Sequence, residues 1–288
     1  MITARVKQLM ERCEAGDPAF PPTVLFGEQW LLRVTCDWFA HHGGDRYPLS
    51  PRPGARWFSE AWLPSAFMAR FRGDPLAESR THADSVIGHF AIGDPGTAGL
   101  ALAPEATQLV VLEAKLFNRL SAGVKNAPGF DQAARTIACM AEILRRADRR
   151  PEDVADLSFL ILAPRARIDD GVFARDTDPA SILAKVRRRA EAYGPDREAW
   201  LAEWFEPTLA RLDLRCLAWE DLVETVAFHE PADGQVLDAF YGKCLHFNRP
   251  AQRAAYPGAR AGANRPWTGP KGQTPAAPEP RRLEPASH

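Results

Sequence analysis

The segment Leu109-Val110-Val111-Leu112-Glu113-Ala114-Lys115 joins four consecutive apolar residues to an acid and a base. A short apolar run with a polar ending is typical of a strand that is buried on both faces of a sheet. Side chains two positions apart on a strand point to the same face, so Glu113 and Lys115 should project together while Ala114 faces the other layer. The segment therefore predicts a buried strand with an acid and a base at its end.

The surrounding segments predict an α/β fold with one central mixed sheet. Upstream we expect helices at residues 2–13 and 28–39, a partly helical aromatic segment at 57–71, and strands at 85–92 and 99–103 with a turn at 94–96. Downstream we expect helices at 131–147, 180–192, 197–212 and 233–245, and strands at 157–162 and 214–219. The order from residue 28 to 163 is then helix, three strands, helix, strand.

The composition is that of a globular protein with a distinct C-terminal tail. The chain has 288 residues, of which 45% are hydrophobic and 25% charged, and its net charge is −1. Seven prolines fall after residue 250, together with six Lys/Arg and two acids. Such a segment buries too little apolar surface to offset its ordering entropy. We expect a single folded domain at 1–250, which carries a charge of −5, and a flexible basic tail at 251–288.

Cysteine usage and hydropathy point to a cytoplasmic protein that does not enter the membrane. The five cysteines are scattered without a CxxC pair, and three of them lie in apolar segments. No apolar run approaches the roughly 18 residues that span a bilayer. Phosphate-binding glycine loops and serine-nucleophile motifs are also absent from the sequence, which argues against nucleotide-dependent motors, dehydrogenases and serine hydrolases.

An acid beside a lysine at a strand end suits metal-assisted hydrolysis. The carboxylate can bind a hard divalent cation, and the ammonium can orient water or stabilise charge on a phosphate. One carboxylate binds Mg²⁺ weakly, so a second acid should approach Glu113. Asp84, at the head of the first predicted strand, is the leading candidate, and Glu105, in the turn before Leu109, is a weaker one because it should lie at the opposite strand end.

Asp84 followed by β-structure, and Glu113-Ala114-Lys115 ending an apolar strand before a helix and a strand, resemble the PD-(D/E)XK nuclease superfamily over residues 28–163. The resemblance implies a three-layer restriction-endonuclease-like core in which Asp84 and Glu113 bind Mg²⁺ or Mn²⁺ and Lys115 assists the attacking water. It also implies a role for Gln132, early in the next helix, and for Glu28, as an acid from the first helix. In this chain Asp84 follows Ala83 rather than a proline.

The resemblance implies a nuclease that hydrolyses DNA, or alternatively RNA. The other hypothesis is a catalytically inactive nuclease-like module that binds nucleic acid or a protein partner. Each residue also has a structural interpretation: an ion pair for Glu113 and Lys115, a loop or cap for Asp84, and helix-terminal roles for Gln132 and Glu28. The oligomeric state stays open.

Two further groups of residues are candidates for contacts with nucleic acid. One is the basic clusters at 145–150 and 185–189, joined by Lys125, which are otherwise solvated helix faces. The other is the aromatic group Trp57, Phe58 and Trp62, which could stack on bases or belong to the core.

Overall fold

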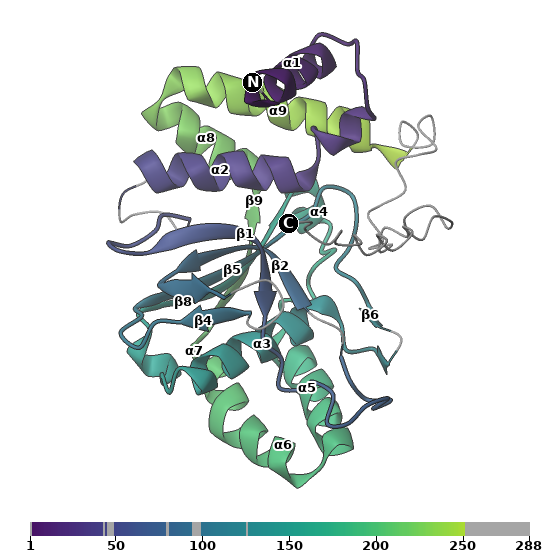
Figure 1. Cartoon of the computed structure of the whole chain (residues 1–288), viewed down its shortest axis with the longest axis vertical. Coiled ribbons are helices and arrows are strands. Elements are labelled where there is room, and N and C mark those ends of the chain that lie inside the picture. Colours follow the sequence, from purple (N-terminus) through teal and green to yellow (C-terminus); the bar gives the residue numbers. More distant parts are fainter. Residues whose placement is uncertain are drawn as a thin grey trace, which may run out of the picture.

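A five-stranded mixed sheet forms the centre of the computed structural model, which describes residues 2–250 except 43, 45–48, 79–80, 94–98 and 125. The sheet has the order β1-β2-β5-β8-β9 (Figure 1). Its strands are β1 (Arg56–Leu63), β2 (Thr81–Gly88), β5 (Gln108–Ala114), β8 (Asp156–Ala163) and β9 (Asp213–Ala218). The predicted α/β class and the central mixed sheet are confirmed.

Strand direction changes across the sheet at β5. β1 and β2 are antiparallel, as are β2 and β5, whereas β5, β8 and β9 run parallel. A parallel pair needs a crossover connection, and helix α3 (Gln132–Arg146) provides it between β5 and β8. The polar end of β5 therefore lies beside the start of α3.

Helices cover both faces of the sheet (Figure 1). One side holds α1 (Ile2–Glu14), α2 (Glu28–His42), α8 (Trp219–His229) and α9 (Pro231–Asn248), and the other holds α3, α5 (Pro179–Tyr193), α6 (Pro195–Trp200) and α7 (Glu206–Arg211). Alternate residues of β5 enter the two cores: Val110 and Leu112 face α2, whereas Leu109 and Val111 face α3. This double coverage explains why the apolar run of β5 is continuous rather than alternating.

Short elements complete the described part of the chain. They are η1 (Pro22–Val24), β6 (Gly123–Val124), β7 (Ala127–Pro128), η3 (Pro151–Asp153), α4 (Arg165–Asp169) and a π-helical stretch at Leu201–Phe205. None of the helices described here is long and apolar enough to cross a membrane.

Helix α3 begins and ends within a residue of its predicted bounds. Asp131 is its N-cap, and the carboxylate accepts a 3.0 Å hydrogen bond from the backbone N–H of Ala134. Ile137 and Leu144 on its apolar stripe are buried against the sheet. The strong 3.6-residue periodicity of this segment explains why its bounds could be predicted.

The aromatic segment at 57–71 is not partly helical as predicted, because its first half is strand β1. β1 is an edge strand that carries Trp57, Phe58 and Trp62. The spacing of these aromatic residues fits a helix as well as a strand, so the pattern was ambiguous. Trp57 lies opposite Ile87, and Trp62 lies opposite His82. The prediction therefore missed the first strand of the sheet.

The predicted strand at 99–103 forms, but it lies outside the central sheet. Residues Leu100–Leu102 form β4, which pairs with β3 (Phe90–Ile92) in a separate two-stranded sheet. The predicted strand at 85–92 is correspondingly two strands, β2 and β3, divided at Gly88. A side chain at Gly88 would meet the carbonyl oxygen of Gln108 at 2.3 Å, and its φ is +154°, so this turn out of the sheet requires glycine.

Three predicted features lie outside the described residues. These are the turn at 94–96, Lys125 and the tail at 251–288. Helix α8, between β9 and α9, was not predicted from the sequence. Its acidic first turn follows β9 directly at Trp219, without a glycine or proline to separate the two elements.

Candidate functional site

Glu113 is buried at the end of β5, on the face that α3 covers. Its side chain is fully shielded from solvent. The Gln132 amide donates a 2.5 Å hydrogen bond to Glu113 Oε2, and the Thr136 hydroxyl lies 3.5 Å from Oε1. Gln132 and Thr136 are one turn apart on α3, so they reach the same carboxylate. The first turn of α3 therefore holds Glu113 in place.

Asp84 lies beside Glu113 on the neighbouring strand. It is the fourth residue of β2 rather than the head of the strand, and it immediately precedes Ser85, whose pair with Leu112 is the terminal pair between β2 and β5. Its Oδ2 accepts a 2.8 Å hydrogen bond from the backbone N–H of Ala114. The Asp84 carboxylate thus binds the N–H of β5 just where the ladder between the two strands stops.

Lys115 joins the two acids. Its ammonium donates to Asp84 Oδ2 at 3.3 Å, to Glu113 Oε2 at 3.4 Å and to the carbonyl oxygen of Ala114 at 3.0 Å. Burial lowers the pKa of Lys115, but the negative charges of Asp84 and Glu113 outweigh burial and raise it. The lysine therefore stays charged, and three oxygen atoms converge on it.

Burial is the main influence on the protonation of Glu113. Removal of the carboxylate from water raises its pKa well above 4.5, and the charge of Asp84 raises it further, while Lys115 lowers it in part. The ionised form of Glu113 is therefore less favoured in the folded protein than in an exposed glutamate. A second cation at this position would shift the equilibrium toward the ionised form.

Glu28 and Glu105 have different positions with respect to this group. Glu28 begins α2, and its Oε2 accepts a 3.0 Å hydrogen bond from the backbone N–H of Leu116. Its negative charge also raises the pKa of Lys115. Glu105 is exposed in the turn that precedes β5, about 20 Å of strand length from Glu113, so it does not belong to the site.

Glu60 is an acid near this group that the sequence analysis missed. It occupies the β1 position across from Asp84, between the pairs Ser59–Ser85 and Ala61–Ala83. Its φ is +58°, in the left-handed region that non-glycine residues seldom adopt. Burial and the charge of Asp84 raise the pKa of Glu60. The helical interpretation of residues 57–71 hid this acid, because Glu60 lies across from Asp84 only when β1 is a strand.

The donor set at the end of β5 is compatible with a magnesium ion. Mg²⁺ binds oxygen atoms and is usually held by one or two carboxylates, with water and substrate phosphates in the other positions. Asp84 Oδ2, Glu113 Oε2 and the Ala114 carbonyl oxygen meet at one cationic point, the Lys115 ammonium. In the part of the chain described here, no three His, Cys, Asp or Glu side chains are grouped so as to hold a metal by themselves.

The basic clusters at 145–150 and 185–189 make ion pairs within the protein. Arg145 and Arg146 both bind Glu142 at 2.8 Å, and Arg150 lies 3.3 Å from Glu203. In the second cluster, Lys185 binds Asp131 and Arg187 binds Glu206. The first cluster is a solvated helix face as predicted, whereas in the second only Arg187 and Arg188 are exposed and Arg189 is buried beside Glu78.

The comparisons with known proteins do not place the chain in a family. No protein-family description, curated protein or solved structure matches it.

Proposed function

We propose that the protein is a metal-dependent phosphodiesterase that cleaves DNA, or alternatively RNA, and that its sheet and helices form a restriction-endonuclease-like core. The convergence of Asp84 Oδ2, Glu113 Oε2 and the Ala114 carbonyl oxygen on the Lys115 ammonium carries the proposal. The five-stranded mixed sheet between two helical layers is compatible with such a core, although β1 takes the place in the sheet that was predicted for residues 99–103.

Asp84 and Glu113 would hold Mg²⁺ or Mn²⁺, with the Ala114 carbonyl oxygen as a third protein ligand. When bound, the metal acidifies a water molecule and stabilises negative charge on the phosphate. Lys115 contributes a fixed positive charge beside the two acids, which would stabilise negative charge on a phosphate at the site. The Gln132 amide holds Glu113 Oε2 in place, and a bound divalent cation would favour the ionised form of Glu113.

The alternative is a nuclease-like module that binds nucleic acid without cutting it. The closed state of the site favours this alternative. Glu113 is fully buried and Lys115 is only 7% exposed, so access from solvent is mainly through Asp84. A buried acid with a raised pKa, neutralised by an adjacent lysine, can also serve as a purely structural ion pair.

A cleavage assay tests the proposal. Plasmid and single-stranded DNA are incubated with wild type, Glu113→Ala or Lys115→Ala in Mg²⁺ or Mn²⁺, and structured RNA is tested in parallel. Glu105→Ala is the matched control, because it removes a glutamate at the opposite, exposed end of β5. We expect wild type and Glu105→Ala to cut, and the two site variants to lose at least about 100-fold in rate.

Two results would contradict this proposal. If wild type and every variant bind DNA but leave it intact, the binding-module alternative holds. If wild type, Glu113→Ala and Lys115→Ala cut equally, the cleavage depends on a different site or on a contaminant.

A further inference from the structure

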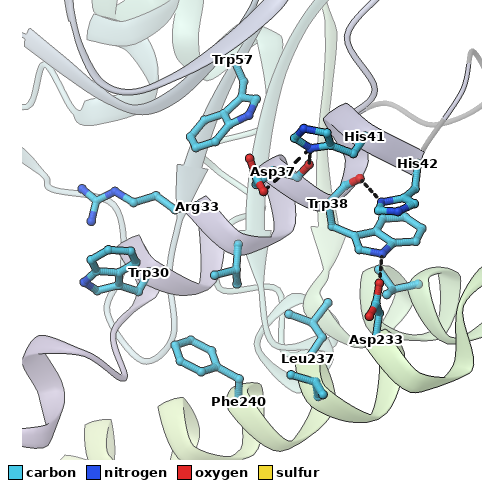
Figure 2. Close-up of a pocket in the computed structure, with 13 residues that line it drawn as sticks. Trp30, Arg33, Asp37, Trp38, His41, His42, Trp57, Asp233, Leu237 and Phe240 are labelled. Atoms are coloured by element: carbon cyan, nitrogen blue, oxygen red, sulfur yellow. Dashed lines mark hydrogen bonds and ion pairs between the residues drawn. The ribbon is translucent and has the colours of Figure 1, made fainter. Parts of the chain in front are cut away.

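A cavity of about 730 Å³ lies between α2, β1, α8 and α9, on the side of the sheet that α2 covers (Figure 2). Three tryptophans line it, namely Trp30 and Trp38 from α2 and Trp57 from β1, and Phe240 from α9 closes another side. The volume and the lining of apolar and aromatic side chains with a few polar groups are typical of small-molecule sites rather than of packing defects.

Strand β1 connects the cavity to the candidate site. On β1, Trp57 precedes Glu60 by three residues, which is about 10 Å of strand, and Glu60 lies across from Asp84. Glu113 faces α3 and the cavity lies on the α2 side of the sheet, so a polynucleotide at Asp84 and Glu113 would reach the cavity by passing Glu60 on β1.

Arg33 lies at the boundary between the cavity and the site. Its guanidinium donates a 2.9 Å hydrogen bond to Ser59 Oγ, and it lies 3.6 Å from the Glu60 carboxylate. The same guanidinium lies 5.1 Å from the centre of the Trp30 ring. One arginine thus touches both an aromatic wall of the cavity and the strand that carries Glu60.

The charges in the cavity suit a neutral aromatic ligand better than a phosphate. Asp37 and Asp233 both line it, and two carboxylates would repel a phosphate. Asp233 accepts a 2.9 Å hydrogen bond from Trp38 Nε1, and Arg33 is paired with Glu60. A nucleobase carries no formal charge, stacks on tryptophan, and offers amino groups that the Asp37 carboxylate can accept.

We propose that this cavity binds an unpaired nucleobase of the nucleic-acid substrate, one to three nucleotides from the phosphate at Asp84 and Glu113. Trp30 and Trp57 would stack on the base. Because a base inside a duplex cannot enter, the cavity selects single-stranded or unpaired segments. This inference rests on the proposed function, since it assigns a substrate class to the same site.

Binding of fluorescein-labelled oligonucleotides tests the proposal in Ca²⁺, which supports binding without requiring turnover. The probes are a single-stranded 12-mer of about site size, the same oligonucleotide with abasic positions introduced one at a time, and the blunt duplex. Wild type is compared with Trp30→Ala, Trp57→Ala and Trp30→Phe. Phe71→Ala is the control, because Phe71 is an exposed aromatic residue that does not line the cavity.

We expect Trp30→Ala and Trp57→Ala to bind the single strand about 10-fold more weakly, and Trp30→Phe and Phe71→Ala to bind like wild type. One of the abasic positions should weaken the binding of the oligonucleotide to wild type by a similar factor. The same abasic position should not change the binding to Trp30→Ala, because the two changes remove the same contact. Duplex binding should not respond to either tryptophan variant. Circular dichroism melts show that the variants are folded, and Trp30→Phe separates stacking from packing.

The outcomes separate this inference from the proposed function. If wild type cleaves DNA but folded Trp30→Ala and Trp57→Ala bind every probe like wild type, the cavity does not bind a base and the nuclease proposal stands. If base-dependent binding holds but wild type never cleaves, the cavity assignment stands within the binding-module alternative. If wild type binds no oligonucleotide, both proposals fail and the aromatic cavity belongs to another ligand, such as a protein segment.

Discussion

Asp84 Oδ2 accepts a 2.8 Å hydrogen bond from the backbone N–H of Ala114, thirty residues further along the chain. This bond lies where the β2–β5 ladder ends, so the carboxylate replaces a backbone carbonyl as acceptor. The same oxygen lies 3.3 Å from the Lys115 ammonium. Asp84 therefore has a structural role at the strand end in addition to any role toward a metal.

Two substitutions of Asp84 should separate these roles. Asp84→Asn keeps an oxygen acceptor for Ala114, whereas Asp84→Ala leaves that N–H without its partner. We expect Asp84→Ala to lower the free energy of unfolding by about 1–3 kcal/mol and Asp84→Asn to lower it less. Both should lose Mg²⁺-dependent cleavage, because a neutral amide is a poor magnesium ligand. Urea denaturation and the cleavage assay measure the two effects, and equal stability losses would argue against the structural role.

Removal of the Lys115 charge should destabilise the fold. Lys115→Met leaves Asp84 and Glu113 close together in a buried position without a cation between them. Breaking a buried ion pair on one side costs about 3–5 kcal/mol. Lys7→Met is the control, because its pair with Glu11 is exposed. If Lys115→Met loses no more free energy of unfolding than Lys7→Met in urea denaturation, the group of Asp84, Glu113 and Lys115 contributes little to stability.

Gln132 should act on catalysis through Glu113. Its amide binds both Glu113 Oε2 and, as acceptor, the backbone N–H of Ser121. Residues that orient a metal ligand typically change activity or metal affinity by about 10–100-fold. We expect Gln132→Ala to raise the Mg²⁺ concentration that gives half-maximal cleavage. Thr136→Val should raise it by a smaller factor, because the Thr136 hydroxyl lies 3.5 Å from Glu113 Oε1. Unchanged Mg²⁺ dependence in Gln132→Ala would remove Gln132 from the site.

Divalent cations should stabilise the folded protein. A ligand that binds only the native state at 100 times its Kd adds about 2.7 kcal/mol to the free energy of unfolding. We expect Mg²⁺ and Mn²⁺ to raise the Tm of wild type and of Glu105→Gln, but not that of Glu113→Gln. Differential scanning fluorimetry over a range of cation concentrations measures the shift. An equal shift in Glu113→Gln would place the cation elsewhere.

Glu142 should make stability depend on acid pH. Burial alone would raise its pKa, but hydrogen bonds from Arg145 and Arg146 outweigh burial and lower the pKa below 4.5. The folded state therefore binds the Glu142 proton less readily than the unfolded state. Its stabilisation is present above pH 4.5 and is lost as the pH falls through the lowered pKa.

Glu142→Gln should accordingly lower the free energy of unfolding by about 1 kcal/mol at pH 7. The difference between wild type and the variant should vanish at the acid end of the pH range. Glu191→Gln, an exposed position on α5, is the control and should change little at either pH. Thermal melts of the three proteins from pH 2.5 to pH 7 measure the effect. A constant difference between wild type and Glu142→Gln across this range would contradict the lowered pKa.

Local patterns were sufficient for the best-defined elements of the fold. The four apolar residues before Glu113 indicated β5, and the periodicity of residues 131–147 indicated α3 nearly to the residue. Local patterns were insufficient at Trp57–Leu63, where aromatic spacing fits a helix as well as an edge strand. They also misplaced residues 99–103, because strand formation is local but the choice of sheet depends on the turn at Gly88.

The sequence by itself indicated that Glu113 and Lys115 share one face of a strand, because side-chain alternation is a property of the backbone. Only the tertiary structure brought Asp84, Gln132 and Glu28 to the same strand end, since these contacts join segments 19 to 88 residues apart. Glu60 and the aromatic cavity also depend on tertiary structure, because β1 pairs with β2 and packs under α2 only in the folded chain. Periodicity reports the local environment of a residue, whereas the partners across a sheet depend on how the whole chain minimises exposed apolar surface.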